Sequence, residues 1–223
     1  MSLNIQPVII PEVNILDSEY TVSLYGMSVQ HPKEWIARFG KVLYREHGVM
    51  DILEPSSKCE ALFTVMWRPY QSLFLNHSFE ETEVEQSMLQ KGFKSFASPL
   101  GRGKKDREIP DPDDPEIYTK ARVALQSYKN KVRAGFKNDF GEYKLLEDEE
   151  TTFNTHYAIK EVSSFTAAHG VIKKSKIKVR RQSFYFVCPE SKRLIILHSS
   201  VSLDDQNLYK ECFDRFLATF RCH

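Results

Sequence analysis

The stretch RRQSFYFVCPESKRLIILHSS, residues 180–200, decides the fold because it predicts a β-hairpin with two apolar faces. With the turn at PESK, Phe186 faces Ile195 on one face of the hairpin, and Tyr185 faces Ile196 on the other. A sheet that is wet on one side alternates apolar and polar residues, whereas FYFV and LIIL are continuous apolar runs. We therefore expect another element to cover each face.

One cover follows directly in the sequence. Residues 203–220, LDDQNLYKECFDRFLATF, carry apolar side chains at helical spacing, and Ser202 with Asp205 provides a cap for the start of the helix. The second cover is expected from residues 116–138, an amphipathic segment that follows the helix-starting pair DP. We predict that the two helices pack on opposite faces of a largely antiparallel sheet, which is an α+β fold with α/β/α layers.

The first third of the chain reads as a β-meander. Alternating and apolar runs predict a strand from Tyr20 with a bulge or tight turn at Gly26, and further strands at 35–39, 49–53 and 61–67. Later strands are predicted at 143–146 and 151–165. Since no repeat or composition break marks a boundary, we predict a single domain, residues 1–223, with a helix-plus-loop insertion at about 79–114.

The order of these elements resembles the PsbP-like fold family, which includes the photosystem extrinsic subunit, the Ran-GTPase release factors and many prokaryotic proteins of unknown role. The resemblance rests on LYGMSVQHPKEW, residues 24–35, and on the final hairpin and helix closing on FLATF. It implies an antiparallel sheet sandwiched between helices, and binding rather than catalysis, with no catalytic residue to carry over. The insertion at 79–114 departs from the family pattern.

Composition excludes several classes of protein. Thirty-one Lys and Arg against thirty Asp and Glu leave a formal charge of +1, so no whole-molecule field attracts nucleic acid or an anionic membrane. The four cysteines lack CxxC spacing, which favours reduced thiols in a cytoplasm. A secretory start and an apolar run of about 18 residues are both missing, so we expect no membrane contact.

The catalytic and metal-ligating signals are weak. The seven histidines show no metal-ligand spacing, and we expect Cys222 and His223 at a frayed end, so we predict no metal site and no cofactor. The hairpin register places Ser183 opposite His198, a polar contact without an orienting acid. Cys188 lies five residues along the strand, ~16 Å from this pair, and is expected in the core.

The strongest functional signal is the basic segment KKSKIKVRR, residues 173–181. The basic residues that share one face of this strand are Lys174, Lys176, Lys178 and Arg180. They are typical of a solvated edge strand whose lysines deter aggregation, and the alternative is an anion-binding stripe for an acidic protein surface or a nucleic-acid backbone. The insertion loop would extend that stripe with Arg102, Lys104 and Lys105. Two acidic runs, DPDDPE at residues 111–116 and EDEE at residues 147–150, could equally neutralise it within the molecule.

We predict a non-enzymatic protein-binding or adaptor domain that presents the insertion loop and the basic strand to a protein partner. The alternative is an enzyme, a hydrolase or transferase with a cleft near the insertion. A pocket with several titratable side chains would favour the enzyme, and a flat basic face would favour the adaptor. Nucleic-acid binding through residues 173–181 comes third, because aromatic residues for base stacking are not interleaved there.

Overall fold

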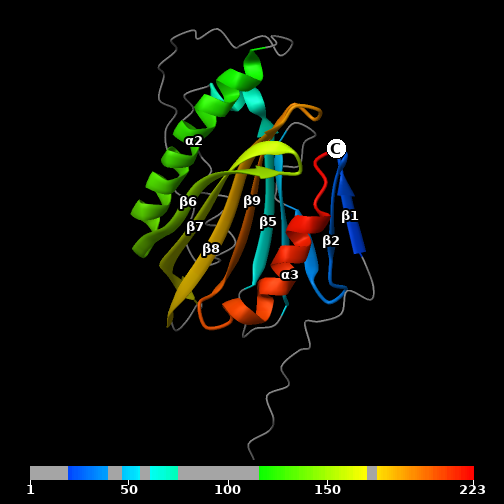
Figure 1. Cartoon of the computed structure of the whole chain (residues 1–223). Coiled ribbons are helices and arrows are strands. Elements are labelled where there is room, and N and C mark those ends of the chain that lie inside the picture. The colour runs from blue at the N-terminus through cyan, green and yellow to red at the C-terminus, as the bar shows by residue number, and fades with distance from the viewer. Residues whose placement is uncertain (1–19, 40–46, 56–60, 75–115, 170–174) are drawn as a thin grey trace, which may run out of the picture.

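A seven-stranded antiparallel sheet forms the centre of the fold (Figure 1). The computed structural model describes residues 20–39, 47–55, 61–74, 116–169 and 175–223. The sheet has the order β3-β4-β5-β9-β8-β7-β6. Its strands are β3 (Ile36–Phe39), β4 (Gly48–Leu53), β5 (Leu62–Pro69), β6 (Gly141–Phe153), β7 (His156–His169), β8 (Ser175–Cys188) and β9 (Arg193–Ser202). The adjacent β3, β4 and β5 confirm the last three strands of the predicted meander, whereas the strand predicted from Tyr20 belongs to a separate sheet.

The hairpin of β8 and β9 has the predicted register. Phe186 is paired with Ile195, and Tyr185 with Ile196. The N–H of Lys192 donates to the Pro189 carbonyl at 3.2 Å and closes the predicted turn.

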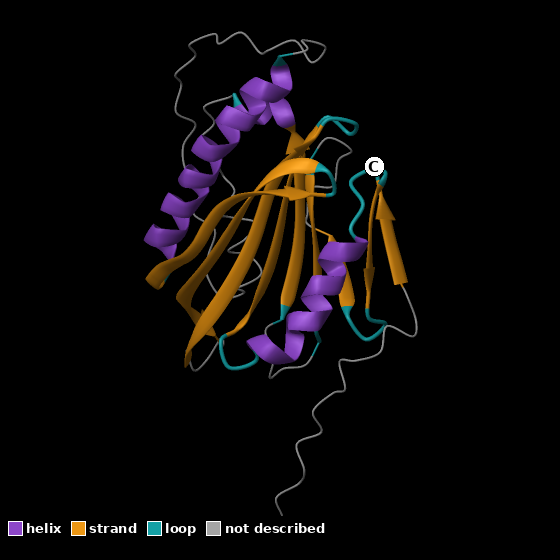
Figure 2. Cartoon of the chain, in the orientation of Figure 1, coloured by secondary structure: helices purple, strands orange, loops and turns teal. Residues whose placement is uncertain are grey.

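Two helices cover opposite faces of this sheet, as predicted (Figure 2). They are α2 (Ile117–Asp139) and α3 (Gln206–Thr219), while a short 3-10 helix, η1 (Tyr70–Leu73), follows β5. Phe216 of α3 packs in one core cluster with Phe186, and Leu125 of α2 packs in another with Tyr185. Because successive strand residues point to opposite faces, the two helices lie on opposite sides of the sheet. The predicted α+β fold with α/β/α layers is confirmed.

A separate two-stranded sheet, β1 (Tyr20–Leu24) and β2 (Met27–His31), lies beside α3 on the side away from α2 (Figure 2). Its strands are joined by Tyr25 and Gly26, which both have positive φ, 51° and 86°. A two-residue turn of this kind matches the twist of a hairpin, so Gly26 is the tight turn that the sequence allowed.

The structure corrects one strand prediction. Residues 151–165 were predicted as a single strand, but a turn at Asn154 and Thr155 divides β6 from β7, with φ of 47° and 71°. Asparagine enters this left-handed region more easily than most residues, and the flanking β-forming composition hid the turn. The predicted insertion at 79–114 lies outside the described residues. No helix in the described part of the chain is long and apolar enough to cross a membrane.

A row of polar side chains crosses the sheet on the α2 side. Cross-strand pairing aligns Asp51, Thr64, His198, Ser183, Glu161 and Asp148, from β4, β5, β9, β8, β7 and β6. Arg133 of α2 forms ion pairs with Asp148 and, at 2.8 Å, with the fully buried Glu161. Lys129, also of α2 and fully buried, pairs with Asp148. The helix is therefore held to the sheet by ion pairs as well as apolar contacts.

Candidate functional site

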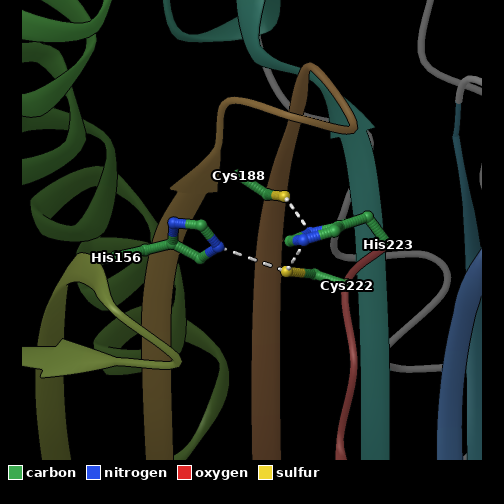
Figure 3. A group of neighbouring side chains, drawn as sticks. All are labelled: His156, Cys188, Cys222 and His223. Carbon is green, nitrogen blue, oxygen red and sulfur yellow. Dashed lines mark hydrogen bonds between the residues drawn. The ribbon is translucent and has the colours of Figure 1, made fainter.

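Two cysteines and two histidines from three parts of the chain meet beside the β8–β9 turn (Figure 3). His156 is the first residue of β7, and Cys188 is the last residue of β8. Cys222 and His223 follow α3, where Arg221 exchanges two backbone hydrogen bonds with Ser28 of β2, at 2.9 and 2.7 Å. The backbone pairing at Arg221 fixes the position of the two residues after it.

The ligand atoms of these four residues all lie within 4.8 Å of one another. The Cys222 Sγ is 3.3 Å from His156 Nε2 and 3.3 Å from His223 Nδ1. The Cys188 Sγ is 3.4 Å from the same His223 nitrogen. All four donors therefore converge on one point, as Figure 3 shows.

Three residues of the cluster are buried, and the fourth, His223, is open to solvent. His156, Cys188 and Cys222 are buried, whereas the His223 side chain is 52% exposed. Phe186 stacks on the His156 ring at 5.9 Å between centroids and 9° between planes, which restrains the imidazole.

Glu190, in the β8–β9 turn, places Oε2 3.8 Å from His156 Nε2 and 3.9 Å from His223 Nδ1. Its carboxylate adds negative charge at the mouth of the cluster.

The contact between the two sulfurs shifts the pKa values of Cys188 and Cys222 in opposite directions. A hydrogen bond from Cys222 lowers the pKa of Cys188 to about 5, although burial opposes the shift. The same contact, together with burial, raises the pKa of Cys222. The contact with Cys222 therefore favours the thiolate form of Cys188, which is the form that binds metals and reacts with oxidants.

Two sulfurs and two imidazole nitrogens are donors that suit soft and borderline metal ions. The sequence predicted no metal site, partly because Cys222 and His223 were expected at a frayed end. That premise fails, since Cys222 is 2% exposed and the preceding residue is paired with β2. The other missed signal is the Asn154–Thr155 turn. With this turn in place, His156 begins β7. Ala158 is paired with Phe186, and two residues further along both strands His156 comes opposite Cys188.

The structure describes part of the predicted basic stripe. Lys176 and Lys178 are exposed, and Arg180 is half-buried on the same face of β8. Lys174, Arg102, Lys104 and Lys105 lie outside the described residues.

β8 is not an edge strand, because it lies between β7 and β9. Its first residues nevertheless project beyond β9, whose pairing with β8 stops at Val179. The projecting end, residues 175–178, pairs only with β7 among the described strands, and the N–H of Leu203 donates to the Lys178 carbonyl at 2.8 Å.

The acidic run EDEE on β6 forms ion pairs on both faces of the sheet. Glu147 lies 3.7 Å from Arg180 and 2.7 Å from Lys160, so it neutralises one end of the basic stripe. The other pairs are Asp148 with Lys129 and Arg133, Glu149 with Lys160, and Glu150 with Arg122. Lys176 and Lys178 form no ion pair with the residues that the structure describes, so EDEE neutralises Arg180 only. Residues 111–115 of the other acidic run lie outside the described residues.

Ser183 and His198 meet as the register predicts. The Ser183 Oγ lies 2.7 Å from His198 Nδ1, and both residues are buried. A substrate in solution has no access to this pair, so it supports the predicted polar contact and not a nucleophile.

Two hollows lined by described residues are small. One, of about 230 Å³, lies against α2 and is lined by Tyr118, Thr119, Arg122, Leu125, Tyr157 and Val187. Another, of about 60 Å³ between α3 and the sheet, includes Arg180, Lys210 and Asp214. Pockets for small-molecule ligands usually measure roughly 300–1,000 Å³, so neither hollow favours an enzyme.

Comparison with protein-family models found no matching family, and comparison with curated proteins found no match. Solved structures with a similar fold include PsbP (CyanoP) from Synechocystis sp. PCC 6803, at 11% identity and a TM-score of 0.45, covering 92% of each chain. PA94 of Pseudomonas aeruginosa, described as a putative regulator, shares 9% identity with a TM-score of 0.43, over 92% of this chain and 97% of that one. The Ran-binding protein Mog1p of Saccharomyces cerevisiae shares 8% identity with a TM-score of 0.43, over 92% and 95%. At these identities the likeness concerns the fold alone.

Proposed function

We propose that this chain is a non-enzymatic protein-binding domain, and that it binds an acidic segment of its partner at the projecting end of β8. The observation that carries the proposal is the exposed pair Lys176 and Lys178, on a strand end that extends past its pairing with β9 and past the bond from Leu203 to the Lys178 carbonyl. An extended peptide adds to such an end through backbone hydrogen bonds, and the lysines select for negative charge.

Three further observations support this proposal over its alternatives. The described hollows are too small for most substrates, and the Ser183–His198 pair is buried. Nucleic acid is less favoured, because binding a backbone usually needs several phosphate contacts and Glu147 already neutralises Arg180. The free thiols Cys188, Cys212 and Cys222 are in keeping with the reducing cytoplasm in which we place this binding.

The insertion loop has a part in this proposal. We propose that Arg102, Lys104 and Lys105 of the predicted insertion also bind the acidic segment of the partner. A variant without residues 98–113 should therefore bind the same partner more weakly, which a pull-down from the native host followed by binding of the purified partner would measure.

The decisive experiment exchanges Lys176 and Lys178 for glutamate. Surface charges contribute less than ~1 kcal/mol each, so unfolding in urea should be nearly unchanged. Association with the purified partner should slow by roughly tenfold at low salt, and the dependence of the rate on salt should largely disappear. Lys131→Glu with Lys137→Glu on α2 makes the same charge change on the opposite side of the sheet and serves as the control.

An unchanged association rate would leave the lysines with only the role of deterring strand pairing at the projecting end. Binding of the same variants to duplex DNA separates the third reading. If nucleic acid were the ligand, each lysine lost would reduce the slope of log affinity against log salt by about 1.

A further inference from the structure

The donor separations in the Cys–His cluster are close to those of a tetrahedral zinc site. Zinc binds sulfur at about 2.3 Å and imidazole nitrogen at about 2.0–2.1 Å, which sets the separation between neighbouring donors at about 3.3–3.8 Å. Three donor pairs already lie at 3.3, 3.3 and 3.4 Å. The other donor atoms lie no more than 4.8 Å apart, so side-chain movements of roughly 1 Å would bring all four to zinc-binding distances.

We propose that His156, Cys188, Cys222 and His223 bind one Zn²⁺ ion through His156 Nε2, His223 Nδ1 and the two sulfurs. The site goes beyond the protein-binding function proposed above and does not depend on it. The two cysteines bind the ion as thiolates, so Zn²⁺ and the two sulfurs form a neutral unit with two neutral imidazoles. A neutral unit suits a place where three of the four residues are buried.

The donor set selects the metal. Mg²⁺ and Ca²⁺ take oxygen ligands, whereas a tetrahedral pair of sulfurs with a pair of nitrogens is typical of zinc. Four protein ligands fill the coordination sphere, so the site is structural and leaves no position for a catalytic water. The exposed side of His223 gives the ion a route in, and the Glu190 carboxylate at the mouth attracts a cation.

The ion would join three places that are distant in the sequence. His156 follows the β6–β7 turn, Cys188 precedes the β8–β9 turn, and Cys222 with His223 follows α3. These connections hold the end of α3 against the sheet, where Phe220 is fully buried. Because the ion binds the folded chain and not the unfolded one, it should stabilise the fold.

The test begins with the full chain purified in a reductant, because neighbouring thiols otherwise oxidise to a disulfide that cannot hold the ion. We expect one Zn²⁺ per chain by elemental analysis, and removal of the ion by a chelator should lower the unfolding midpoint by several degrees. Co²⁺ in place of zinc should give the intense visible bands of a tetrahedral site and the near-ultraviolet band of thiolate-to-cobalt charge transfer.

Variants assign the ligands. Cys222→Ser and His223→Ala should each weaken zinc binding by roughly 100-fold or more. This loss is larger than the usual effect of changing a residue that contacts only the ligands and not the metal. His223 is half exposed, so its variant should fold even if Cys222→Ser does not. Cys212→Ser is the matched control, because Cys212 is a buried cysteine of α3 that lies outside the cluster.

Three outcomes would overturn the assignment. They are a cobalt spectrum without the charge-transfer band, an unfolding midpoint that ignores both zinc and chelator, and a metal content that is the same in His223→Ala as in the wild type.

Discussion

Gly48 shows how single residues limit the packing of the sheet. It is paired with Trp67, which is 1% exposed. A Cβ on Gly48 would lie 2.4 Å from the Cζ2 atom of the indole ring. The ring sits where a side chain would otherwise be, so only glycine fits without moving a fully buried tryptophan.

Gly48→Ala should therefore lower the free energy of unfolding by roughly 1–3 kcal/mol, the usual cost of overpacking a core. Gly135→Ala in α2 is the control, because nothing lies within 4 Å of its Cβ position. That change should raise stability by up to ~1 kcal/mol, since alanine is the better helix former. Urea unfolding measures both. Equal stability of Gly48→Ala and the wild type would mean that Trp67 can shift freely.

Residue contacts were predictable from the sequence where one pattern controls both partners. The apolar runs of the terminal hairpin fix its register, and the register alone places Ser183 beside His198. The Cys–His cluster was not predictable in this way. It needs the turn at Asn154, which strand-like neighbours hide, and a backbone pairing of Arg221 that no local pattern indicates.

At the scale of the elements, β6 depends on ion pairs with its neighbours. Its EDEE segment has poor strand propensity, yet it forms a strand because cations of α2 and β7 pair with its carboxylates. Burial alone would raise the pKa of Asp148, but hydrogen bonds from Lys129 and Arg133 lower it. The interaction stabilises the fold only while Asp148 is ionised.

Since the folded-state pKa of Asp148 lies below the unfolded value, its stabilisation is present above about pH 4 and is lost as pH falls through the lowered pKa. Asp148→Asn should cost about 1.5–3 kcal/mol at neutral pH, the range for hydrogen bonds to charged groups. Urea unfolding from neutral pH to below about pH 4 should show that the free energy of unfolding falls less steeply with acid in the variant than in the wild type.

The control is Asp214→Asn on α3, which removes an exposed pair with Lys210 and should cost ~0.5 kcal/mol or less. Parallel acid curves for Asp148→Asn and the wild type would contradict this account of β6.

The arrangement of the helices on the sheet was predictable from the sequence because it depends on apolar faces. Two apolar faces of one hairpin require two covers, and α2 and α3 are those covers. The position of β8 did not follow, because the lysines at its start are typical of an edge. They lie on the part of the strand that projects past β9, while the rest is buried inside the sheet.

At the scale of the whole molecule, the small β1–β2 sheet is held to the main body by contacts with distant segments. Arg221 pairs with Ser28 through two backbone hydrogen bonds, and Arg193 Nη1 donates to the Tyr25 carbonyl at 2.8 Å. Met27 and Val29 extend the core that α3 covers. The pairing at Arg221 thus serves both the small sheet and the proposed zinc ligands that follow it.

Arg221→Pro tests this double role, because proline lacks the N–H that donates to the Ser28 carbonyl at 2.7 Å. Phe220 already has φ −62° and ψ 133°, a conformation that a residue before proline can adopt. Losing one hydrogen bond costs about 0.5–1.5 kcal/mol, so amides of β2 should exchange hydrogen roughly 2- to 10-fold faster, while β8 and β9 are unaffected.

Zinc affinity should fall in Arg221→Pro as well, because Cys222 and His223 lose the pairing that positions them. Arg221→Ala keeps both backbone hydrogen bonds and should change neither the exchange nor the affinity. Hydrogen exchange followed by mass spectrometry, with and without zinc, measures the first effect, and chelator competition measures the second. Faster exchange in β2 with unchanged zinc affinity would show that the ligands are positioned without the β2 pairing. Unchanged exchange in β2 with weaker zinc affinity would show that the β1–β2 sheet is held by other contacts.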